Sequence, residues 1–264
     1  MNTTSVASGQ SQPQQQVRRL IGAEFLKLRR RRALLVASLV LIVAPMLVSF
    51  TGLIVLHAAN PAKYGPAGGV DNLRGALELL TQIGVVAAVL IGVNSGGGDL
   101  AAGVFRELVV TGRPRLALFV ARIPGGLALL LPLVAVAVVI AATASLALAG
   151  SGQTPGAELL LEYAAWVGLV TTLAFLLALG VASLLDSRAT SIGVLLAWQL
   201  AVAPLLLQTG KVDPVLLGAA VKRLEPGAGS ASASISLPTA IVVIVAWTVV
   251  PLTAGAWRTQ TRDA

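Results

Sequence analysis

The sequence predicts an all-α membrane protein with six transmembrane helices, and three observations carry that prediction. Hydrophobic residues make up 56% of the chain and charged residues only 11%, whereas soluble domains average about 45–50% and about 25%. Six apolar runs are each long enough to cross a hydrocarbon core of about 30 Å, which takes roughly 20 helical residues. The basic residues gather beside the ends of these runs, so the net charge of +8 is a signal of membrane topology. No nucleic-acid partner is expected.

The first 32 residues divide into a polar tail and a basic amphipathic segment. Residues 1–16 are rich in Gln and Ser and have too little apolar surface to fold, which predicts a disordered cytoplasmic tail. Residues 17–32 predict a short helix lying at the membrane surface, with its apolar face toward the acyl chains. That face comprises Val17, Leu20, Ile21, Phe25 and Leu28. The alternative is that this segment is only a basic stop before the first span.

The six spans and their orientation follow from the apolar runs and the basic residues at their ends. The spans are expected at residues 33–57, 76–97, 123–149, 159–184, 190–207 and 237–257, with a short tail at 258–264. Fourteen of the nineteen Lys and Arg residues fall on one side of this arrangement. Because Lys and Arg are in excess in cytoplasmic loops, both termini are expected in the cytoplasm.

The predicted spans contain features that suggest packing rather than proton transport. Their deep thirds contain no ionisable residue, although such residues line the proton pathways of many carriers. Small residues recur every four positions in the second span, which predicts close contact with another helix. This packing stripe comprises Gly84, Ala88, Gly92 and Gly96. A similar stripe is expected at Ala164, Gly168 and Thr172 in the fourth span.

Two connections between spans are long enough to have structure of their own. In the loop near 98–122, Ala102, Phe105, Leu108 and Val109 would share one helical face, which could dock a soluble partner. The segment near 208–236 is expected on the other side of the membrane. Its first half has the spacing of a short amphipathic helix, and its second half is rich in Gly, Ser and Ala.

Sequence motifs for catalysis are missing from the chain. There is no cysteine, no G-x-x-x-x-G-K-[ST] phosphate loop, no HExxH and no GxSxG. We therefore expect a protein that is not an enzyme and that holds no cofactor or metal of its own.

Three stretches together resemble the membrane subunit of bacterial type-2 ABC exporters. AEFLKLRRRR at 23–32 is similar to that family's basic approach to the first helix. GGDLAAGVFRELVVTGRPRLALFVAR at 97–122 is similar to its inner loop, and VVPLTAGAWRTQTRDA at 249–264 to its usual ending. Asp99 stands after a triple glycine where the family more often has a glutamate, so the register of the inner loop differs from the common pattern.

The resemblance implies the permease subunit of an ATP-driven exporter in the bacterial cell (inner) membrane. The chain would form half of a translocation pathway with a second permease copy or a homologue. Two cytoplasmic ABC ATPase subunits would bind the ATP and Mg²⁺, and the cargo would be hydrophobic, lipid-like or a peptide. The implied coupling residues are Phe25, Lys27 and Arg29 in the first helix and Asp99, Gly103, Phe105, Arg106, Glu107, Arg113 and Arg115 in the inner loop.

Two other classes of membrane protein remain open from the residues alone. One is a scaffold or immunity protein that binds lipid or a peptide without pumping. The other is a passive channel or secondary carrier, which the lack of deep charges disfavours.

Overall fold

The structure confirms an all-helical membrane protein. It is a computed structural model that describes residues 12–101, 115–185, 187–210, 212–227 and 235–261, and within these residues it contains helices and no strand. Six helical segments of the described chain are long and apolar enough to cross a membrane. The predicted fold class and the predicted number of spans therefore hold.

The helices follow one another along the chain with short connections. A helix that does not cross the membrane comes first, α1 (Gln12–Arg30), and the first four spans are α2 (Arg32–Ala59), α3 (Val70–Ala101), α5 (Arg115–Ala147) and α6 (Ala157–Leu184). The fifth span consists of α7 (Arg188–Ala197), a π-helical turn (Trp198–Val202) and α8 (Ala203–Thr209). A 3-10 turn, η2 (Asp213–Val215), and the short α9 (Leu217–Arg223) then lead to the last span, α10 (Leu237–Thr261).

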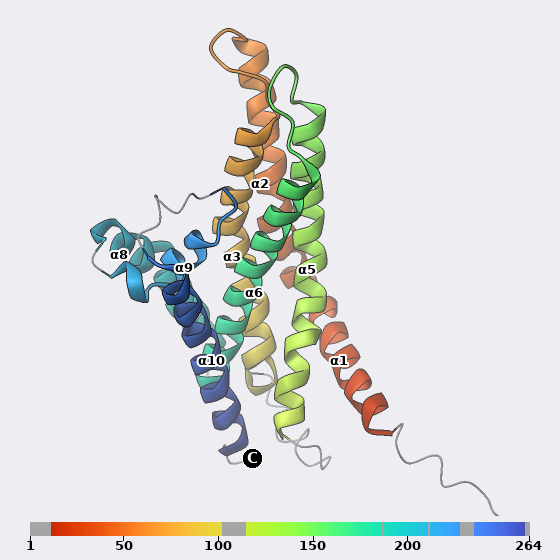
Figure 1. Cartoon of the computed structure of the whole chain (residues 1–264). Coiled ribbons are helices and arrows are strands. Elements are labelled where there is room, and N and C mark those ends of the chain that lie inside the picture. Colours follow the sequence, from red (N-terminus) through yellow and green to blue (C-terminus); the bar gives the residue numbers. More distant parts are fainter. Residues whose placement is uncertain (1–11, 102–114, 186, 211, 228–234, 262–264) are drawn as a thin grey trace, which may run out of the picture.

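Four of the spans form a tall bundle, and the remaining elements flank it (Figure 1). α3 packs along α6, and α2 and α5 complete the group, while α10 lies against α6 and α1 against α5. The basic end of the bundle is defined here as the end that carries α1, the start of α5 and the end of α10. The far end carries the α2–α3 and α5–α6 connections (Figure 1).

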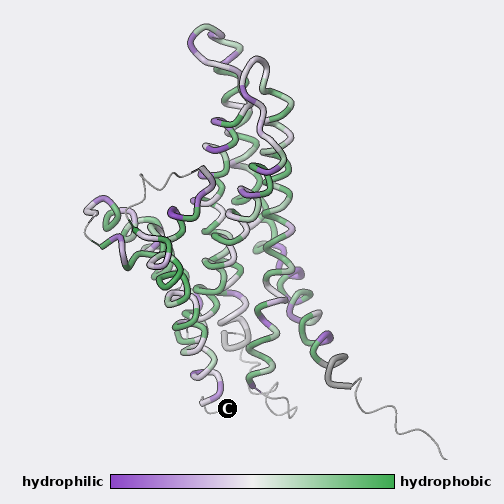
Figure 2. The backbone as a smooth tube through the Cα atoms, viewed as in Figure 1, coloured by the Kyte–Doolittle hydropathy of each residue, from purple (hydrophilic) through white to green (hydrophobic). Residues whose placement is uncertain are grey.

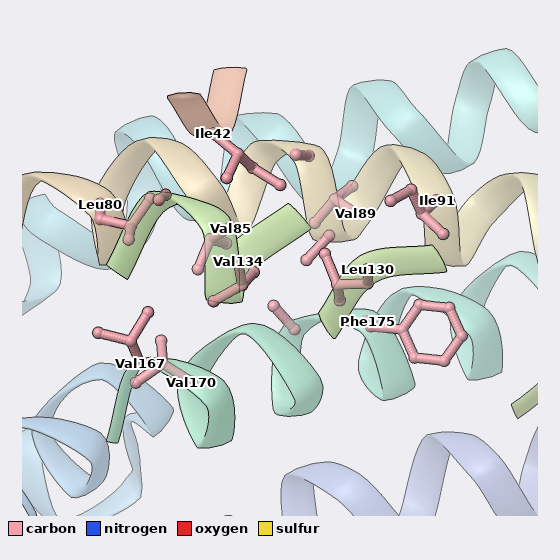
Figure 3. Close-up of a cluster of buried hydrophobic side chains, with 14 of the residues drawn as sticks. Ile42, Leu80, Val85, Val89, Ile91, Leu130, Val134, Val167, Val170 and Phe175 are labelled. Atoms are coloured by element: carbon pink, nitrogen blue, oxygen red, sulfur yellow. The ribbon is translucent and has the colours of Figure 1, made fainter. Parts of the chain in front are cut away.

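The core of the bundle is largely aliphatic, with a few aromatic rings among the aliphatic side chains. Ile42 of α2, Leu80 and Ile91 of α3, and Leu130 of α5 are completely buried together with Phe175 of α6 (Figure 3). Outward-facing positions on α2 and α10 are also apolar, and Figure 2 shows hydrophobic residues along both helices. Val48 and Val242 are 71% and 66% exposed. Apolar exposure on this scale fits a surface solvated by lipid.

The packing stripe of α3 lies directly against α6. A Cβ atom added at Gly92 would stand 2.6 Å from the carbonyl oxygen of Phe175, and one at Gly96 would stand 2.5 Å from that of Leu179. Ala88 is completely buried and Gly84 faces Thr171. Because glycine has no side chain, the two backbones come into contact at these positions, as is common between membrane helices.

The stripe expected in α6 at Ala164, Gly168 and Thr172 is not where that helix packs closely. Nothing lies within 4 Å of a Cβ built on Gly168. The close approach is instead at Gly180, where a Cβ would lie 2.5 Å from the backbone of Pro251 in α10. Small residues every four positions permit an approach but do not determine which face receives a neighbour.

Several helices are longer than their apolar runs. α3 begins six residues before its predicted start and α5 begins eight residues before its own. At 32 and 33 residues and about 1.5 Å per residue, both exceed the hydrocarbon core. Residues 12–16, expected in the disordered tail, belong to α1. The predicted spans captured the part of each helix that faces lipid.

Candidate functional site

Three arginines from different elements gather around the C-terminal end of α3. Arg31 donates from Nη1 to Oδ1 of Asn94 at 2.6 Å, and Arg122 donates from Nη1 to the backbone carbonyl of Gly96 at 3.0 Å. Arg188, at the start of α7, lies close enough to Arg31 to be repelled by its charge. We call Arg31, Arg122 and Arg188 the arginine cluster.

The triple glycine near the end of α3, at residues 96–98, lies beside this cluster. A Cβ on Gly98 would stand 3.5 Å from a guanidinium nitrogen of Arg31, which is an ordinary van der Waals contact. The last carbonyl groups of a helix have no partner within the helix and carry partial negative charge. Guanidinium groups are therefore well suited to this end of α3.

Arg122 is the residue that the sequence reasoning placed wrongly. It was expected in the loop outside the third span, but it lies within α5 and is 2% exposed. A basic residue beside an apolar run is ordinarily assigned to the flank. Its place inside the helix becomes visible only once α5 is seen to begin at Arg115.

α1 is attached to the foot of the bundle through its apolar face. Leu28 is completely buried and Phe25 packs against the main core. A Cβ on Gly125 of α5 would lie 2.6 Å from Cβ of Glu24, so α1 and α5 are in contact there. Lys27 pairs with Glu24 on α1 itself at 2.5 Å, whereas Arg29 is exposed. Of the three coupling residues expected in this helix, Arg29 is the one that faces outward.

Most of the coupling residues expected in the inner loop lie outside the residues that the structure describes. Gly103, Phe105, Arg106, Glu107 and Arg113 lie outside the described residues, as does the side chain of Asp99. Arg115 is described, and its Nη1 donates to the carbonyl oxygen of Gln260 at 3.0 Å. It therefore joins the start of α5 to the end of α10.

A second polar site lies toward the far end, where the segment between α8 and α10 rests on the bundle. Nε of Arg74 donates to Oη of Tyr163 at 2.8 Å, and that hydroxyl donates to the carbonyl oxygen of Pro226 at 3.1 Å. Nε1 of Trp166 donates to the carbonyl of Val221 at 3.1 Å. From the other side, Nε1 of Trp247 donates to the carbonyl of Val215 at 2.8 Å. Side chains of α3, α6 and α10 thus hold the backbone of this segment.

Two carboxyl groups meet at the same place. Glu225, which directly precedes Pro226, lies close enough to Glu78 of α3 for the two carboxyl groups to influence each other. Burial of the Glu225 carboxyl raises its pKa above the ordinary value, and the hydrogen bond to Glu78 and the negative charge of that residue raise it further. Arg74 and Lys222 oppose this increase in the pKa of Glu225 by a smaller amount.

The two polar sites are separated by the thickness of a membrane interior. Glu78 and Gly98 belong to the same helix, and the 20 residues between them span about 30 Å at 1.5 Å per residue. That length equals the hydrocarbon core of a typical bilayer, about 30 Å. The arginine cluster and the Arg74–Tyr163–Pro226 contacts are thus about one hydrocarbon thickness apart along α3, and the α2–α3 and α5–α6 connections extend past the second of them (Figure 1).

The sequence predicted some elements of the second polar site but not that they contact one another. A short helix was expected from the spacing of Val215, Leu216, Leu217, Val221 and Leu224, and α9 occupies this stretch. The contact of α9 with Tyr163 and Trp166 left no sequence signal other than two aromatic residues at the polar end of α6. Interfacial aromatic residues of this kind are common in membrane helices.

The fold and the two polar layers define a multi-pass helical membrane protein. In comparisons with known proteins, no family model and no curated sequence matches this chain. Among the described residues, no group of three or more acidic or histidine side chains could hold a metal ion. The function is therefore argued from the two sites themselves.

Proposed function

We propose that this chain is the permease subunit of an ATP-driven exporter of the type-2 ABC class. It would sit in a bacterial cell membrane with its basic end in the cytoplasm, and separate ATPase subunits would drive it from there. The observation that carries the proposal is that α1 is fixed to the foot of the bundle, where it contacts α5 at Gly125 and where Arg31 binds Asn94 of α3. A soluble partner bound at this end would contact elements that lead directly into the membrane.

A displacement of α1 would be transmitted to the spans through a short series of direct contacts. α1 touches α5 at Gly125, and Arg31, at the junction of α1 and α2, holds Asn94 of α3. α3 in turn contacts α6 backbone to backbone at Gly92, and α6 contacts α10 at Gly180. Close-packed contacts without intervening side chains transmit displacement because they have little room to deform.

The fifth span and α10 support a second permease copy as a partner. Leu200 and Leu205 of the fifth span are 60% and 62% exposed, and Val250 of α10 is 62% exposed. These faces would meet lipid or another six-span subunit. A translocation pathway between two such subunits would need no deep charged group if the cargo were hydrophobic.

The far-end segment has a role in this scheme as a lid. The segment formed by η2 and α9 connects α6 to the last span, because Trp166 of α6 binds it at Val221 and Trp247 of α10 binds it at Val215. Movement of α10 relative to α6 would therefore shift α9 at the outer mouth of the pathway.

The proposal is tested by purifying the tagged chain from its native membrane and asking whether an ATPase comes with it. Phe105→Ala and Arg106→Glu should reduce ATPase recovery and transport-linked ATP hydrolysis, because losing an interface hot spot costs about 2 kcal/mol or more. Lys63→Glu, an exposed charge reversal at the far end, is the matched control and should leave both unchanged.

Two results would count against this function. Full ATPase coupling in correctly inserted Phe105→Ala and Arg106→Glu variants would remove the inner loop as the contact. Cargo movement by the purified chain alone, in vesicles without ATPase or nucleotide, would identify a passive channel or carrier instead.

A further inference from the structure

Two arginines of the cluster lie where the lipid-facing surface of the bundle begins. Arg31 directly precedes α2, and Arg188 is the first residue of α7. Within two turns of each, the side chains are apolar and exposed: Val36 of α2 is 59% exposed and Val194 of the fifth span is 53% exposed. Both guanidinium groups therefore stand at a boundary between polar and hydrocarbon surroundings, the level at which a bilayer has its headgroups.

Contacts with α3 bring the two arginines to the same stretch of that helix. Arg31 donates from Nη1 to Oδ1 of Asn94 at 2.6 Å. A Cβ on Gly97 would lie 3.5 Å from the carbonyl oxygen of Ala182 in the last turn of α6, so the connection from α6 to α7 begins at this level. Arg188 follows that connection and starts α7, which packs along α3.

Within the described part of the chain, neither guanidinium group meets a carboxylate. Arg31 has the neutral amide of Asn94 as its partner, and Nε of Arg188 is buried with no hydrogen bond. Among the described residues of this end, the one carboxylate belongs to Glu24, and it pairs with Lys27. Partly buried cations in such a place lose hydration and gain no compensating anion.

The end of α3 does not supply the missing charge. A helix C-terminus carries roughly half an elementary negative charge, and the buried Arg122 already binds one of the carbonyl groups, that of Gly96, at 3.0 Å. Arg31 and Arg188 each add a full positive charge. The residues that the structure describes here therefore leave a net positive charge for an external anion.

We propose that Arg31 and Arg188 bind the phosphate of an anionic phospholipid in the leaflet at the basic end. Phosphate oxygens accept hydrogen bonds from guanidinium groups, and such bonds between charged groups are short and strong. The acyl chains of the same molecule run along the exposed apolar faces of α2 and the fifth span, which begin beside the two arginines. This continuation into apolar surface favours a lipid over free phosphate, and basic sites between membrane helices bind acidic headgroups in this way. The site goes beyond the proposed transport function and requires neither an ATPase nor a cargo.

The experiment titrates phosphatidylglycerol into the purified chain in neutral detergent and measures bound lipid by native mass spectrometry. Arg188→Gln and Arg31→Gln should each weaken phosphatidylglycerol binding about tenfold or more, because each loses a hydrogen bond between charged groups. Arg258→Gln removes an exposed arginine from the end of α10, at the same end of the bundle, and should bind the lipid as the unmodified chain does. Phosphatidylcholine, which has a phosphate but no net charge, should bind weakly to all four chains.

Melting temperatures separate lipid binding from a loss of fold. Arg188→Gln relieves the repulsion by Arg31, so without lipid its melting temperature should equal or exceed that of the unmodified chain. Phosphatidylglycerol should raise the melting temperature of the unmodified chain, since a ligand stabilises the state that binds it, and should raise that of Arg188→Gln by less. Inorganic phosphate should raise neither.

Several outcomes would overturn the site. Equal phosphatidylglycerol binding by the Arg188→Gln and unmodified chains would exclude the arginine as a ligand, and a lower melting temperature of Arg188→Gln without lipid would make it a structural contact. An equal loss of binding in Arg258→Gln would mean attraction to the whole basic end. Stabilisation by inorganic phosphate alone would assign the arginines to a soluble anion.

Discussion

Individual glycines determine how closely the spans approach, and their environments differ within a single helix. Gly92 faces the backbone of α6 with no room for a Cβ, whereas nothing lies within 4 Å of a Cβ built on Gly75 of the same helix. At Gly75 a methyl group would meet open space. The identical substitution at these two positions therefore separates packing from helix propensity.

We predict that Gly92→Ala destabilises the protein and Gly75→Ala does not. A methyl group at Gly92 would stand 2.6 Å from the Phe175 carbonyl oxygen, and overpacking of this kind costs about 1–3 kcal/mol. Gly75→Ala should be neutral or stabilising by up to about 1 kcal/mol, because alanine favours the helix. Thermal unfolding of both variants in the same detergent checks this. Equal melting temperatures would mean that α3 and α6 can separate at no cost.

Gly227 sets the backbone at the Pro226 contact. Its φ is +74°, a region that other residues seldom adopt, and a Cβ there would collide with the guanidinium of Arg74. We predict that Gly227→Ala releases the segment at Pro226, and faster amide hydrogen exchange of residues 217–224 would report this release. Gly210→Ala, also at positive φ but with nothing within 4 Å, should strain its turn without that release.

At the scale of elements, the sequence predicted the spans well and their ends poorly. Apolar runs report the length in contact with lipid, so every span was found. They do not report where a helix continues into the interface, and for this reason the starts of α3 and α5 and the position of Arg122 were missed. The stripe of α3 was interpretable because Gly92 and Gly96 are within one face. The close contact of α6 with α10, at Gly180, depends on the arrangement in space and left no such pattern.

The fifth span shows how a proline shapes an element. Pro204 has no backbone N–H, and the residues just before it form a π-helical turn, in which the amide of Ala203 bonds to the carbonyl of Trp198. Such turns absorb a break in the helical hydrogen-bond ladder. Trp198 also stacks on Trp247 of α10, with ring centroids 5.5 Å apart. The turn therefore lies where the fifth and sixth spans meet.

We predict that α9 loosens when one of its tryptophan anchors is replaced. Trp166→Phe keeps an aromatic ring but removes the hydrogen bond to Val221, which is worth about 0.5–1.5 kcal/mol. Amide hydrogen exchange of residues 217–224 should quicken by a few-fold to about tenfold. Trp257→Phe, an exposed change on α10 at the basic end, is the control. Unchanged exchange in Trp166→Phe would show that apolar packing alone holds α9.

For the whole molecule, the charge distribution and the two polar layers lead to one topology. Seven of the basic residues precede or begin the first span, and four more were expected between the second and third spans. In the structure, α1, the start of α5 and the end of α10 meet at the same end (Figure 1). Because Lys and Arg near span ends favour the cytoplasmic side, this end is predicted to face the cytoplasm.

Single engineered cysteines test that topology in intact cells, since the chain has none of its own. Ser151→Cys places a thiol at an exposed position of the far end, and Gln10→Cys places one ahead of α1. A membrane-impermeant maleimide should label Ser151→Cys from outside and should reach Gln10→Cys only after permeabilisation. The reverse pattern would put the arginine cluster outside the cell, where no ATPase could act on it.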